Sequence, residues 1–335
     1  MRTLVLGGTS FVGGRLLEHL HAAGAQVTLL NRGSTPPPAG VEQLVADRKI
    51  DASVSAVLRG TQWEAVYDVS GFVMAAGGSS FEQLVDLLDG RTGRYVFVSS
   101  IMAYAPSGFF PWHEDQPYRD DPATTYGGFK ASAERVLLGA ARERGFPATV
   151  ARPAAIYGRE NNIYDMEAAM FTRLRRGLPV LLPHGGLVTT SYGHVDDLCA
   201  GLLALGRHPA AVGEAFNITG EGVSSAQYVQ TLAEIVGVEA DVVHVPDGAG
   251  APRGASVYGH LFAAKHHGVL STDKARRLVD LPPARDFTTG HRETYEWFCA
   301  SPLADVDSTI ADPLWGAGFD LALEAEVAAS LRVRA

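Results

Sequence analysis

A glycine-rich segment near the start of the chain, Gly7-Gly8-Thr-Ser-Phe-Val-Gly13, constrains the fold more than any other feature. It lies between a predicted strand, Thr3–Leu6, and a predicted amphipathic helix, Phe11–Ala23. Glycine permits a tight turn and lets a pyrophosphate approach the N-terminal amides of a helix, and Gly13 lets helix and strand pack closely. This setting favours a dinucleotide-binding loop over a plain glycine-rich turn, with serine at position 10 as a variant of the usual pattern. The expected cofactor contacts in this loop are Gly7, Thr9, Ser10, Phe11, Val12 and Gly13.

The N-terminal half alternates short apolar runs with amphipathic helical stretches, which is typical of a parallel sheet covered by helices. The later predicted strands of this half are Val27–Leu30, Val41–Ala46, Ala65–Val69, Tyr95–Val98 and Ala148–Arg152. Its later predicted helices are Phe81–Leu88 and Tyr126–Arg144. We therefore expect an α/β fold, a Rossmann-type doubly wound parallel sheet with a smaller C-terminal α/β substrate domain.

The alternation loosens after Arg152-Pro153, where the second domain is expected to begin. Helices are predicted at Met166–Arg176, Asp196–Leu205, Ser225–Val236, Asp273–Val279 and the C-terminal end, and Phe216–Ile218 is predicted to return to the main sheet. The expected cofactor domain comprises residues 1–155 plus about 194–220. The expected substrate domain comprises about 156–193 plus 221–335.

The composition, with 46% hydrophobic and 19% charged residues, indicates an ordinary soluble globular protein. The formal net charge of −9 argues against wholesale nucleic-acid binding, which needs a basic footprint. Cys199 and Cys299 are too few and too far apart for a disulfide framework or a metal cluster. The apolar run before Gly7 is too short for a signal peptide, and no apolar run approaches membrane-spanning length. A cytoplasmic protein without a metal site is therefore expected.

The end of the second predicted strand indicates which nicotinamide cofactor the chain prefers. A carboxylate there would bind the adenosine ribose of NAD and repel a 2′-phosphate, but this chain has Asn31-Arg32. Arg32 can clamp a 2′-phosphate, so NADP is favoured; NAD stays open if Arg32 only stacks on adenine or lies in solvent. Asp47-Arg48, after the third strand, either contacts the adenine or forms a surface pair. Ser70, after the fourth strand, is a further expected cofactor contact.

A proton-transfer pair is predicted in the segment Tyr126-Gly-Gly-Phe-Lys130. Residues four apart share a helix face, so the Lys130 ammonium can lie beside the Tyr126 phenol. A free phenol has a pKa of about 10, and a nearby cation lowers that pKa. Ser100 follows the strand Tyr95–Val98 at the carboxyl edge of the sheet, where its hydroxyl can bind a substrate oxygen. The spacing is weak evidence alone, but together with Ser100 and the glycine loop it makes Ser100, Tyr126 and Lys130 the candidate catalytic residues.

In these motifs the chain resembles the extended short-chain dehydrogenase/reductases of the NAD-dependent epimerase/dehydratase family, over nearly its whole length. The matching segments are Gly7–Gly13, Val98–Tyr104, Tyr126–Lys130 with Glu134, Arg152–Gly158, Gly193–Leu198 and Phe216–Ile218. The Gly-Gly-Thr loop and the Asn-Arg-Gly turn are also similar to a subgroup that includes chloroplast stem-loop binding proteins. The resemblance implies a Rossmann domain, a C-terminal domain that encloses a sugar-nucleotide-like substrate, and Ser100, Tyr126 and Lys130 as the catalytic triad. It further implies that Lys130 holds the nicotinamide ribose, that Pro153 helps to seat the carboxamide, and that a homodimer forms through the helix of Tyr126.

Two departures from the family narrow the expected chemistry. Members that eliminate water or carbon dioxide carry acidic residues just after the catalytic hydroxyl, whereas this chain has Ile101 and Met102, which transfer no proton. Phe129 stands where serine commonly precedes the catalytic lysine. We therefore predict an NAD(P)-dependent epimerase acting on a sugar or sugar-nucleotide-like substrate through a transient ketone. An NADPH-dependent ketoreductase or dehydrogenase of a small molecule is the alternative, and an RNA-binding protein on a Rossmann fold is a third possibility.

Overall fold

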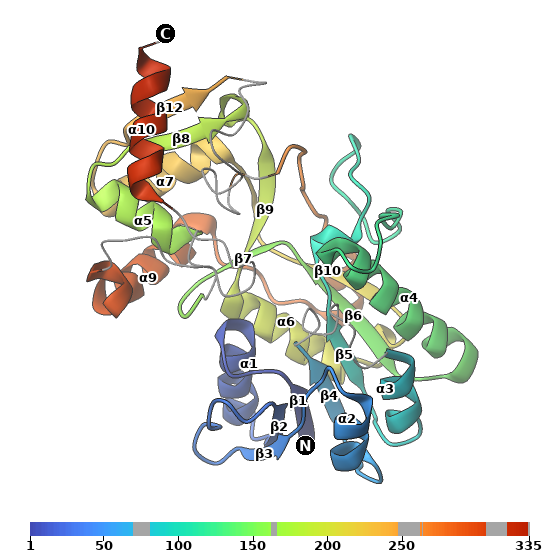
Figure 1. The fold of residues 1–335 in the computed structure, drawn as a ribbon. Helices are drawn as coiled ribbons and strands as arrows, with labels where there is room; N and C mark the ends of the chain where they lie inside the picture. The colour runs from blue at the N-terminus through green and yellow to red at the C-terminus, as the bar shows by residue number, and fades with distance from the viewer. Residues whose placement is uncertain (70–80, 162–165, 247–261, 263, 306–319, 334–335) are drawn as a thin grey trace. The chain divides into compact units, whose positions relative to one another are not determined.

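The computed structural model describes residues 1–69, 81–161, 166–246, 262, 264–305 and 320–333, and the chain divides into two compact units (Figure 1). The first unit contains Met1–Ala154, Val195–Thr219 and Leu270–Ala284. The second contains Ala155–His194, Gly220–Val269 and Arg285–Ala335. The expectation that Leu270–Ala284 belongs to the substrate domain is wrong, because its helix α8 (Asp273–Val279) packs on strand β10 (Ala215–Ile218) of the first unit.

The first unit is built on a seven-stranded sheet with the strand order β10-β6-β5-β4-β1-β2-β3, in which all neighbouring strands are parallel. Its strands are β1 (Arg2–Leu6), β2 (Gln26–Asn31), β3 (Glu42–Val45), β4 (Ala65–Asp68), β5 (Tyr95–Val98), β6 (Ala148–Pro153) and β10. The central strands are buried along their length, as a sheet covered on both faces requires. This confirms the Rossmann-type sheet and the return of the segment around Asn217 to its edge.

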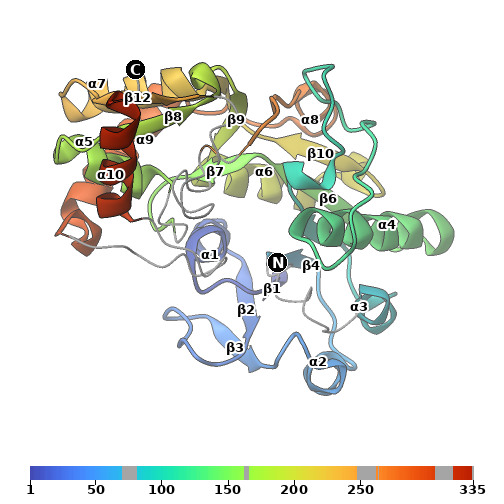
Figure 2. The ribbon, with the colours of Figure 1, turned by 45° about the horizontal axis from the view of Figure 1, so that its top comes forward.

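Helices cover both faces of this sheet (Figure 2). Helices α1 (Phe11–Ala22) and α6 (Val195–Arg207) pack together on one face. Helices α2 (Asp51–Leu58), α3 (Phe81–Leu88) and α4 (Tyr126–Arg144) share a core with the other face. Because the strands are parallel, all their carboxyl ends lie at one edge, and the segments that follow β1, β2 and β5 begin there. This edge brings the glycine loop and Ser100 together.

The second unit contains two small sheets and four α-helices among its described residues. In one sheet, β9 (Thr189–His194) pairs with β7 (Ala155–Tyr157) in parallel and with β11 (Gly222–Ser224) antiparallel. In the other, β8 (Val180–Pro183) and β12 (Val242–Val245) are parallel. The helices are α5 (Glu167–Arg175), α7 (Ser225–Val236), α9 (Phe287–Ala300) and α10 (Leu321–Arg332). In neither unit does a described helix combine the length and the apolar character that crossing a bilayer requires.

Candidate active site

The loop after β1 has a backbone geometry that fits a dinucleotide pyrophosphate. Gly8 adopts a φ of +134°, a conformation that residues with a side chain rarely take. A Cβ added at Gly13 would overlap the Gly8 Cα, so the loop and the first turn of α1 are in direct contact. Ser10 is the N-cap residue of α1, and its side chain makes no capping hydrogen bond to the helix. The first backbone amides of α1 therefore have no side-chain cap from Ser10, and a helix start of this kind is suited to the predicted pyrophosphate contact.

The loop after β2 carries Arg32 as an exposed side chain. The Asn31 Oδ1 atom accepts hydrogen bonds from the Gly33 amide at 2.8 Å and from Gln43 Nε2 at 2.8 Å. The Asn31 side chain therefore fixes the turn internally, and the guanidinium of Arg32 is the charged group at this strand end. An exposed arginine at the end of the second strand is the arrangement that fits a ribose 2′-phosphate.

Arg48, predicted either to contact the adenine or to form a surface pair, is buried in this structure and paired with Asp68. Its side chain is 4% exposed, and Nη2 donates a 2.9 Å hydrogen bond to Asp68 Oδ2. The Tyr95 hydroxyl donates to the same oxygen at 2.7 Å. Asp47 remains near the edge, where its Oδ1 accepts from the Lys49 amide at 2.9 Å. Ser70, the other cofactor contact predicted nearby, lies outside the described residues.

Helix α4 begins at Tyr126, and close backbone packing determines where it begins. The Thr125 side chain caps the helix by accepting a hydrogen bond from the Gly128 amide at 3.2 Å. A Cβ at Gly127 would overlap the Met102 carbonyl oxygen, and one at Gly128 would overlap the Pro122 carbonyl oxygen. The two glycines therefore let the start of α4 approach the segment that follows Ser100. The sequence pattern by itself gave no reason for this glycine pair.

The structure brings the two candidate catalytic hydroxyls into contact. Ser100 follows β5, is buried, and accepts a hydrogen bond from the Met102 amide at its Oγ at 3.1 Å. The side chains of Ser100 and Tyr126 are hydrogen-bonded to each other. Because Ser100 lies at a strand end and Tyr126 at a helix start, both hydroxyls lie at the carboxyl edge of the sheet, as predicted.

Lys130 lies one turn after Tyr126 on α4 and is only 4% exposed. Its Nζ atom donates a 2.7 Å hydrogen bond to the Val98 carbonyl oxygen. The same atom lies 4.8 Å from the centroid of the Phe97 ring and 5.6 Å from that of the Tyr126 ring. Burial lowers the pKa of Lys130 to about 8, against the opposing effect of nearby carboxylates. The lysine is therefore close to the phenol, as the spacing predicted.

The predicted lowering of the Tyr126 pKa is not found in this structure. Burial raises the pKa of the phenol, and the hydrogen bond with Ser100 opposes that rise only in part. The reason lies in the position of Lys130, whose ammonium is directed to the Val98 carbonyl and lies over the phenol ring. The Tyr126 phenol is therefore protonated at neutral pH, a state in which it can donate a proton to a substrate oxygen.

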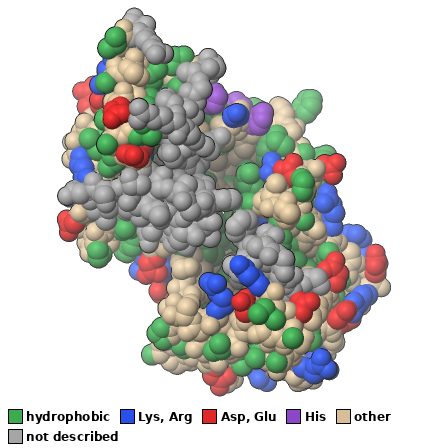
Figure 3. All heavy atoms as spheres, in the orientation of Figure 1, with side chains coloured by type: hydrophobic (Ala, Val, Ile, Leu, Met, Phe, Trp, Pro, Cys, Tyr) green, Lys and Arg blue, Asp and Glu red, His purple; other side chains and the backbone are tan. Residues whose placement is uncertain are grey.

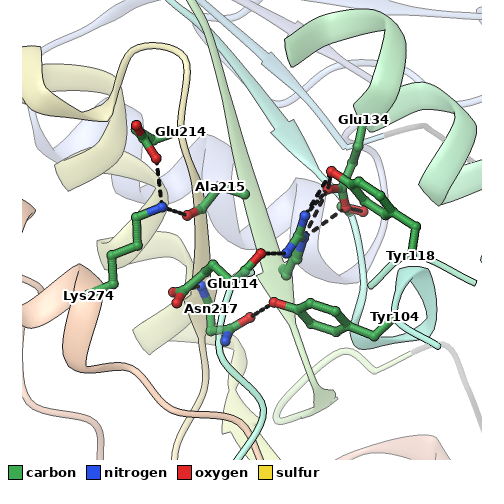
Figure 4. Close-up of polar contacts among 10 residues, drawn as sticks. Tyr104, Glu114, Tyr118, Glu134, Glu214, Ala215, Asn217 and Lys274 are labelled. Carbon is green, nitrogen blue, oxygen red and sulfur yellow. Dashed lines mark hydrogen bonds and ion pairs between the residues drawn. The ribbon is translucent and has the colours of Figure 1, made fainter. Parts of the chain in front are cut away.

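A buried ion pair anchors α4 to the sheet (Figure 4). Glu134 is fully buried and accepts hydrogen bonds from Arg152 at 2.6 and 2.9 Å and from the Ser99 hydroxyl. The Tyr118 hydroxyl donates to Glu134 at 3.0 Å and accepts from Arg152 at 2.9 Å. These contacts join α4 to the end of β5 through Ser99 and to β6 through Arg152, and so fix the position of the helix.

A second set of polar contacts anchors the segment between β5 and α4 (Figure 4). The Tyr104 hydroxyl donates to Asn217 Oδ1 at 2.7 Å, and the backbone amide of Asn217 donates to Glu114 Oε1 at 2.8 Å. Lys274 of α8 donates to Glu214 at 2.7 Å and to the Ala215 carbonyl at 2.8 Å. Strand β10 is thereby connected both to this segment and to α8.

Sequence reasoning did not single out Asp68, Glu114 or Tyr118 as members of the site. Asp68 ends a predicted strand at the carboxyl edge of the sheet, a position that could have identified it. Glu114 and Tyr118 lie in a segment without periodic pattern, so no sequence signal indicated them. Pro153 ends β6 in a buried position beside Ile218. Throughout the part of the chain that the structure describes, no group of three or more histidine, cysteine or acidic side chains is placed to hold a metal ion.

Known proteins are similar to this chain in sequence and in architecture. The sequence matches the NAD dependent epimerase/dehydratase family over residues 3–219. The Arabidopsis thaliana chloroplast stem-loop binding protein of 41 kDa b is 28% identical over 314 residues, which cover 88% of this chain and 78% of that protein. A dTDP-glucose 4,6-dehydratase of Streptomyces antibioticus is 26% identical over 325 residues, covering 89% of this chain and 92% of that protein. A 4-hydroxy-2-methyl-3-oxo-4-farnesyl-3,4-dihydroquinoline-1-oxide ketoreductase of Stigmatella aurantiaca is 27% identical over 263 residues, covering 73% and 76%.

A solved structure supports the same fold. The epimerase Mth375 of Methanothermobacter thermautotrophicus aligns with a TM-score of 0.72 and 23% identity, covering 89% of this chain and 92% of that chain. The family match includes the glycine loop, Ser100, Tyr126 and Lys130, the residues that the first unit assembles at one edge of its sheet. The chain belongs to the NAD dependent epimerase/dehydratase family and is an NAD(P)-dependent enzyme of the extended short-chain dehydrogenase/reductase type.

Proposed function

We propose that this protein is an NAD(P)-dependent epimerase of a sugar or sugar-nucleotide-like substrate. In this reaction an alcohol carbon is oxidised to a transient ketone and reduced again from the opposite face. The observation that carries the proposal is the contact between the Ser100 and Tyr126 hydroxyls, one helical turn from the buried Lys130. These three groups can pass a proton to and from a single substrate oxygen, a step that oxidation and reduction share.

Different residues of the first unit would bind the cofactor, orient the substrate oxygen and transfer its proton. When bound, the nicotinamide ring accepts and returns the hydride of the reacting carbon. The segment Gly7–Gly13 would hold the pyrophosphate, and Lys130 and Pro153 would hold the nicotinamide riboside. The Ser100 hydroxyl, fixed by the Met102 amide, orients the substrate oxygen by a hydrogen bond. Tyr126, protonated in this structure, gives its proton to that oxygen in reduction. In oxidation it accepts the proton only as the phenolate, a form that burial disfavours and that a nearby positive charge on Lys130 favours.

The cofactor that the second strand favours is NADP. Arg32 is exposed at the end of β2, and the neighbouring Asn31 side chain is engaged in fixing the turn. A guanidinium stabilises a 2′-phosphate by charge-assisted hydrogen bonds, whereas a carboxylate at this place would repel it. We therefore propose that NADP binds more tightly than NAD.

Elimination of water, which the name of the Streptomyces antibioticus relative describes, is not the reaction that we propose for this chain. Elimination needs an acid and a base next to the reacting carbons, in addition to the tyrosine. The two residues after Ser100 are Ile101 and Met102, whose side chains carry no transferable proton. The relay of this chain is therefore limited to oxidation, reduction or both in sequence.

A one-way ketoreductase is the second candidate, and the surroundings of Ser100 favour it. Ile101 packs against an apolar cluster that contains Tyr104 and Trp112, and Met102 is 44% exposed. An apolar surface next to the catalytic hydroxyl fits a substrate that is less polar than a sugar. The name of the Stigmatella aurantiaca relative describes such an enzyme. In this case NADPH is consumed and the alcohol leaves after a single transfer.

RNA binding is the third candidate, and it comes from the name of the Arabidopsis relative. Proteins that bind RNA through its phosphates need a field of basic side chains. The formal net charge of this chain is −9, and on the face drawn in Figure 3 the described basic side chains of the first unit are interspersed with acidic ones. A filter-binding assay with structured RNA at physiological salt tests this candidate, and tight binding that resists salt would favour it over an enzyme.

The experiment that separates the two enzymatic candidates follows the cofactor and the product together. The full-length protein is incubated with NAD or NADP and UDP-glucose or dTDP-glucose, and in parallel with NADPH and a panel of ketones. Epimerisation converts the sugar nucleotide into its epimer without a net change in reduced-cofactor absorbance. Ketone reduction consumes NADPH in proportion to the alcohol that forms. A dehydrated 4-keto sugar as the product would contradict the proposed function.

A further inference from the structure

Lys130 carries its charge in a place where water cannot solvate it. Its side chain is 4% exposed, and its Nζ atom is bonded to the Val98 carbonyl oxygen and lies 4.8 Å from the centroid of the Phe97 ring. A carbonyl dipole and a ring face both favour an ammonium, but each contributes much less than a formal negative charge. The ion therefore needs carboxylates nearby to remain charged at neutral pH.

Asp68 supplies one of these carboxylates from the neighbouring strand. It is fully buried at the end of β4, and its Cα is paired in register with that of Phe97 on β5. Its Oδ2 atom accepts hydrogen bonds from Arg48 at 2.9 Å and from the Tyr95 hydroxyl at 2.7 Å. The carboxylate therefore lies beside the part of β5 on which the lysine rests, and its two donors fix its position there.

Glu134 supplies the other carboxylate from the helix itself. It lies four residues after Lys130 on α4, is fully buried, and is bonded to Arg152 and to the Ser99 hydroxyl. Ser99 directly follows Val98, the residue whose carbonyl accepts from the lysine. Two buried carboxylates are thus near the lysine, one on the neighbouring strand and one on its own helix, and each is paired with an arginine.

We propose that Asp68 and Glu134 are positioning residues that keep Lys130 charged and fixed against the end of β5. The inference rests on the proposed catalytic role of Lys130, but the charge of the lysine can be measured without any turnover. Asp68 and Glu134 both raise the pKa of Lys130, whereas burial lowers it to about 8. The titratable or charged groups around the lysine are Asp68 on β4, Tyr95 on β5, Tyr126 and Glu134 on α4, and the guanidiniums of Arg48 and Arg152.

The arrangement gives a reason for the burial of Arg48, the arginine that follows β3. Arg48 forms a buried ion pair with Asp68, as Arg152 does with Glu134. Removing either carboxylate leaves the lysine with less compensation for its burial, so a part of the population becomes neutral at physiological pH. A neutral lysine no longer favours the phenolate form of Tyr126.

The experiment measures the protonation of Lys130 by NMR in the full-length protein, with and without the carboxylates. The chain has four lysines, so labelling with [ε-13C]lysine gives four signals, and Lys130→Met identifies the one of interest. In the parent protein the Lys130 signal is expected to titrate near pH 8. Asp68→Asn and Glu134→Gln, which preserve shape, are each expected to lower this midpoint by about one pH unit. If the parent protein has neither epimerase nor ketoreductase activity, the proposed function is refuted, but the measured charge of Lys130 is unaffected.

The matched control is Glu324→Gln, which removes a buried carboxylate from an arginine pair in the second unit. Glu324 accepts hydrogen bonds from Arg173 at 2.7 and 2.5 Å, so its loss disrupts a comparable ion pair. It is expected to leave the Lys130 midpoint unchanged. An unchanged midpoint in both Asp68→Asn and Glu134→Gln, or an equal shift in Glu324→Gln, would overturn the proposal.

If Asp68→Asn or Glu134→Gln does not fold, the double variants Arg48→Met/Asp68→Asn and Arg152→Met/Glu134→Gln remove each pair as a unit. Replacing a whole buried ion pair is tolerated far better than removing one partner. Each double variant also removes a guanidinium, whose positive charge opposes that of the lysine, so the midpoint is expected to fall in both double variants but by less than in the single variants. A midpoint equal to that of the parent in these variants would overturn the proposal.

Discussion

The Lys130 Nζ atom donates a 2.7 Å hydrogen bond to the Val98 carbonyl oxygen, so helix α4 is attached to the strand that leads to Ser100. Tyr126 begins the same helix, one turn earlier, and its hydroxyl contacts that of Ser100. The helix start and the strand end are therefore joined at two points. The four-residue spacing between Tyr126 and Lys130 matters because it places both groups against one strand end.

Gly13→Ala is expected to abolish nicotinamide cofactor binding. The new Cβ would overlap the Gly8 Cα, so the loop or the first turn of α1 must shift, and the anion site at the helix start is lost. Cofactor fluorescence titration measures the effect. Gly139→Ala is the control, because a Cβ there meets nothing within 4 Å and replaces glycine inside α4. Gly139→Ala is expected to bind cofactor like the parent and to gain about 0.5–1 kcal/mol of stability. If Gly13→Ala binds the cofactor as tightly as the parent, the segment Gly7–Gly13 is not the cofactor-binding loop.

Arg32→Ala is expected to weaken NADP binding about tenfold or more while changing NAD binding little. The guanidinium is exposed at the end of β2, where only NADP has a phosphate for it to bind. Isothermal titration with both cofactors gives the two affinities. Arg144→Ala, which removes an exposed arginine at the far end of α4, serves as the control for a general charge effect. Equal losses for both cofactors would show that Arg32 does not recognise the 2′-phosphate.

The stability difference between the parent and Lys130→Met is expected to depend on pH. The pKa of Lys130 falls from an ordinary 10.5 to about 8 on folding, so between these values the unfolded chain binds more protons than the folded one. The parent should therefore gain stability relative to the variant as pH rises from about 8 to about 10.5, by roughly 3 kcal/mol in total. Below pH 8 the difference should be constant.

Urea unfolding of both proteins at closely spaced pH values measures this difference. Taking the difference cancels every other titrating group that the two proteins share. Parallel stability curves from pH 7 to pH 10 would mean that the lysine is not buried as a charge.

The elements that the sequence predicted best have strong periodicity and their own caps. Helix α4 spans Tyr126–Arg144 as predicted, with Thr125 as its cap, and α7 spans Ser225–Val236 as predicted, with a capping box at Ser224. Helix α9 (Phe287–Ala300) was not predicted, because it contains threonines and a glycine that disfavour a helix. It forms because Phe287 and Phe298 pack into the core of the second unit.

The short strands of the second unit were not predicted either, since each has only a few residues and pairs with partners distant in sequence. Strand β7, for example, spans Ala155–Tyr157 and pairs with residues 192–194. A three-residue strand has no periodic pattern from which to infer it. Long-range pairing of this kind is decided by packing in the folded chain.

The candidate site was predictable where chemistry follows from position along the chain. Ser100, Tyr126 and Lys130 come from a strand end and one helix face, which the sequence pattern locates. The direction in which Arg48 points was not predictable, because it depends on the buried Asp68 carboxylate from another strand. The upward shift of the Tyr126 pKa likewise depends on burial, which the spacing of residues does not reveal.

The central claim is that Tyr126 transfers the proton, and the most direct test is the turnover of Tyr126→Phe with its cofactor affinity measured alongside. The variant keeps the ring and loses the phenol hydroxyl that contacts Ser100. Turnover on the substrate found in the cofactor and product assay is expected to fall about 10²–10⁴-fold, while cofactor affinity changes little. Tyr295→Phe, the same change on α9 of the second unit, should retain the parent activity. Turnover of Tyr126→Phe equal to that of the parent would contradict the account.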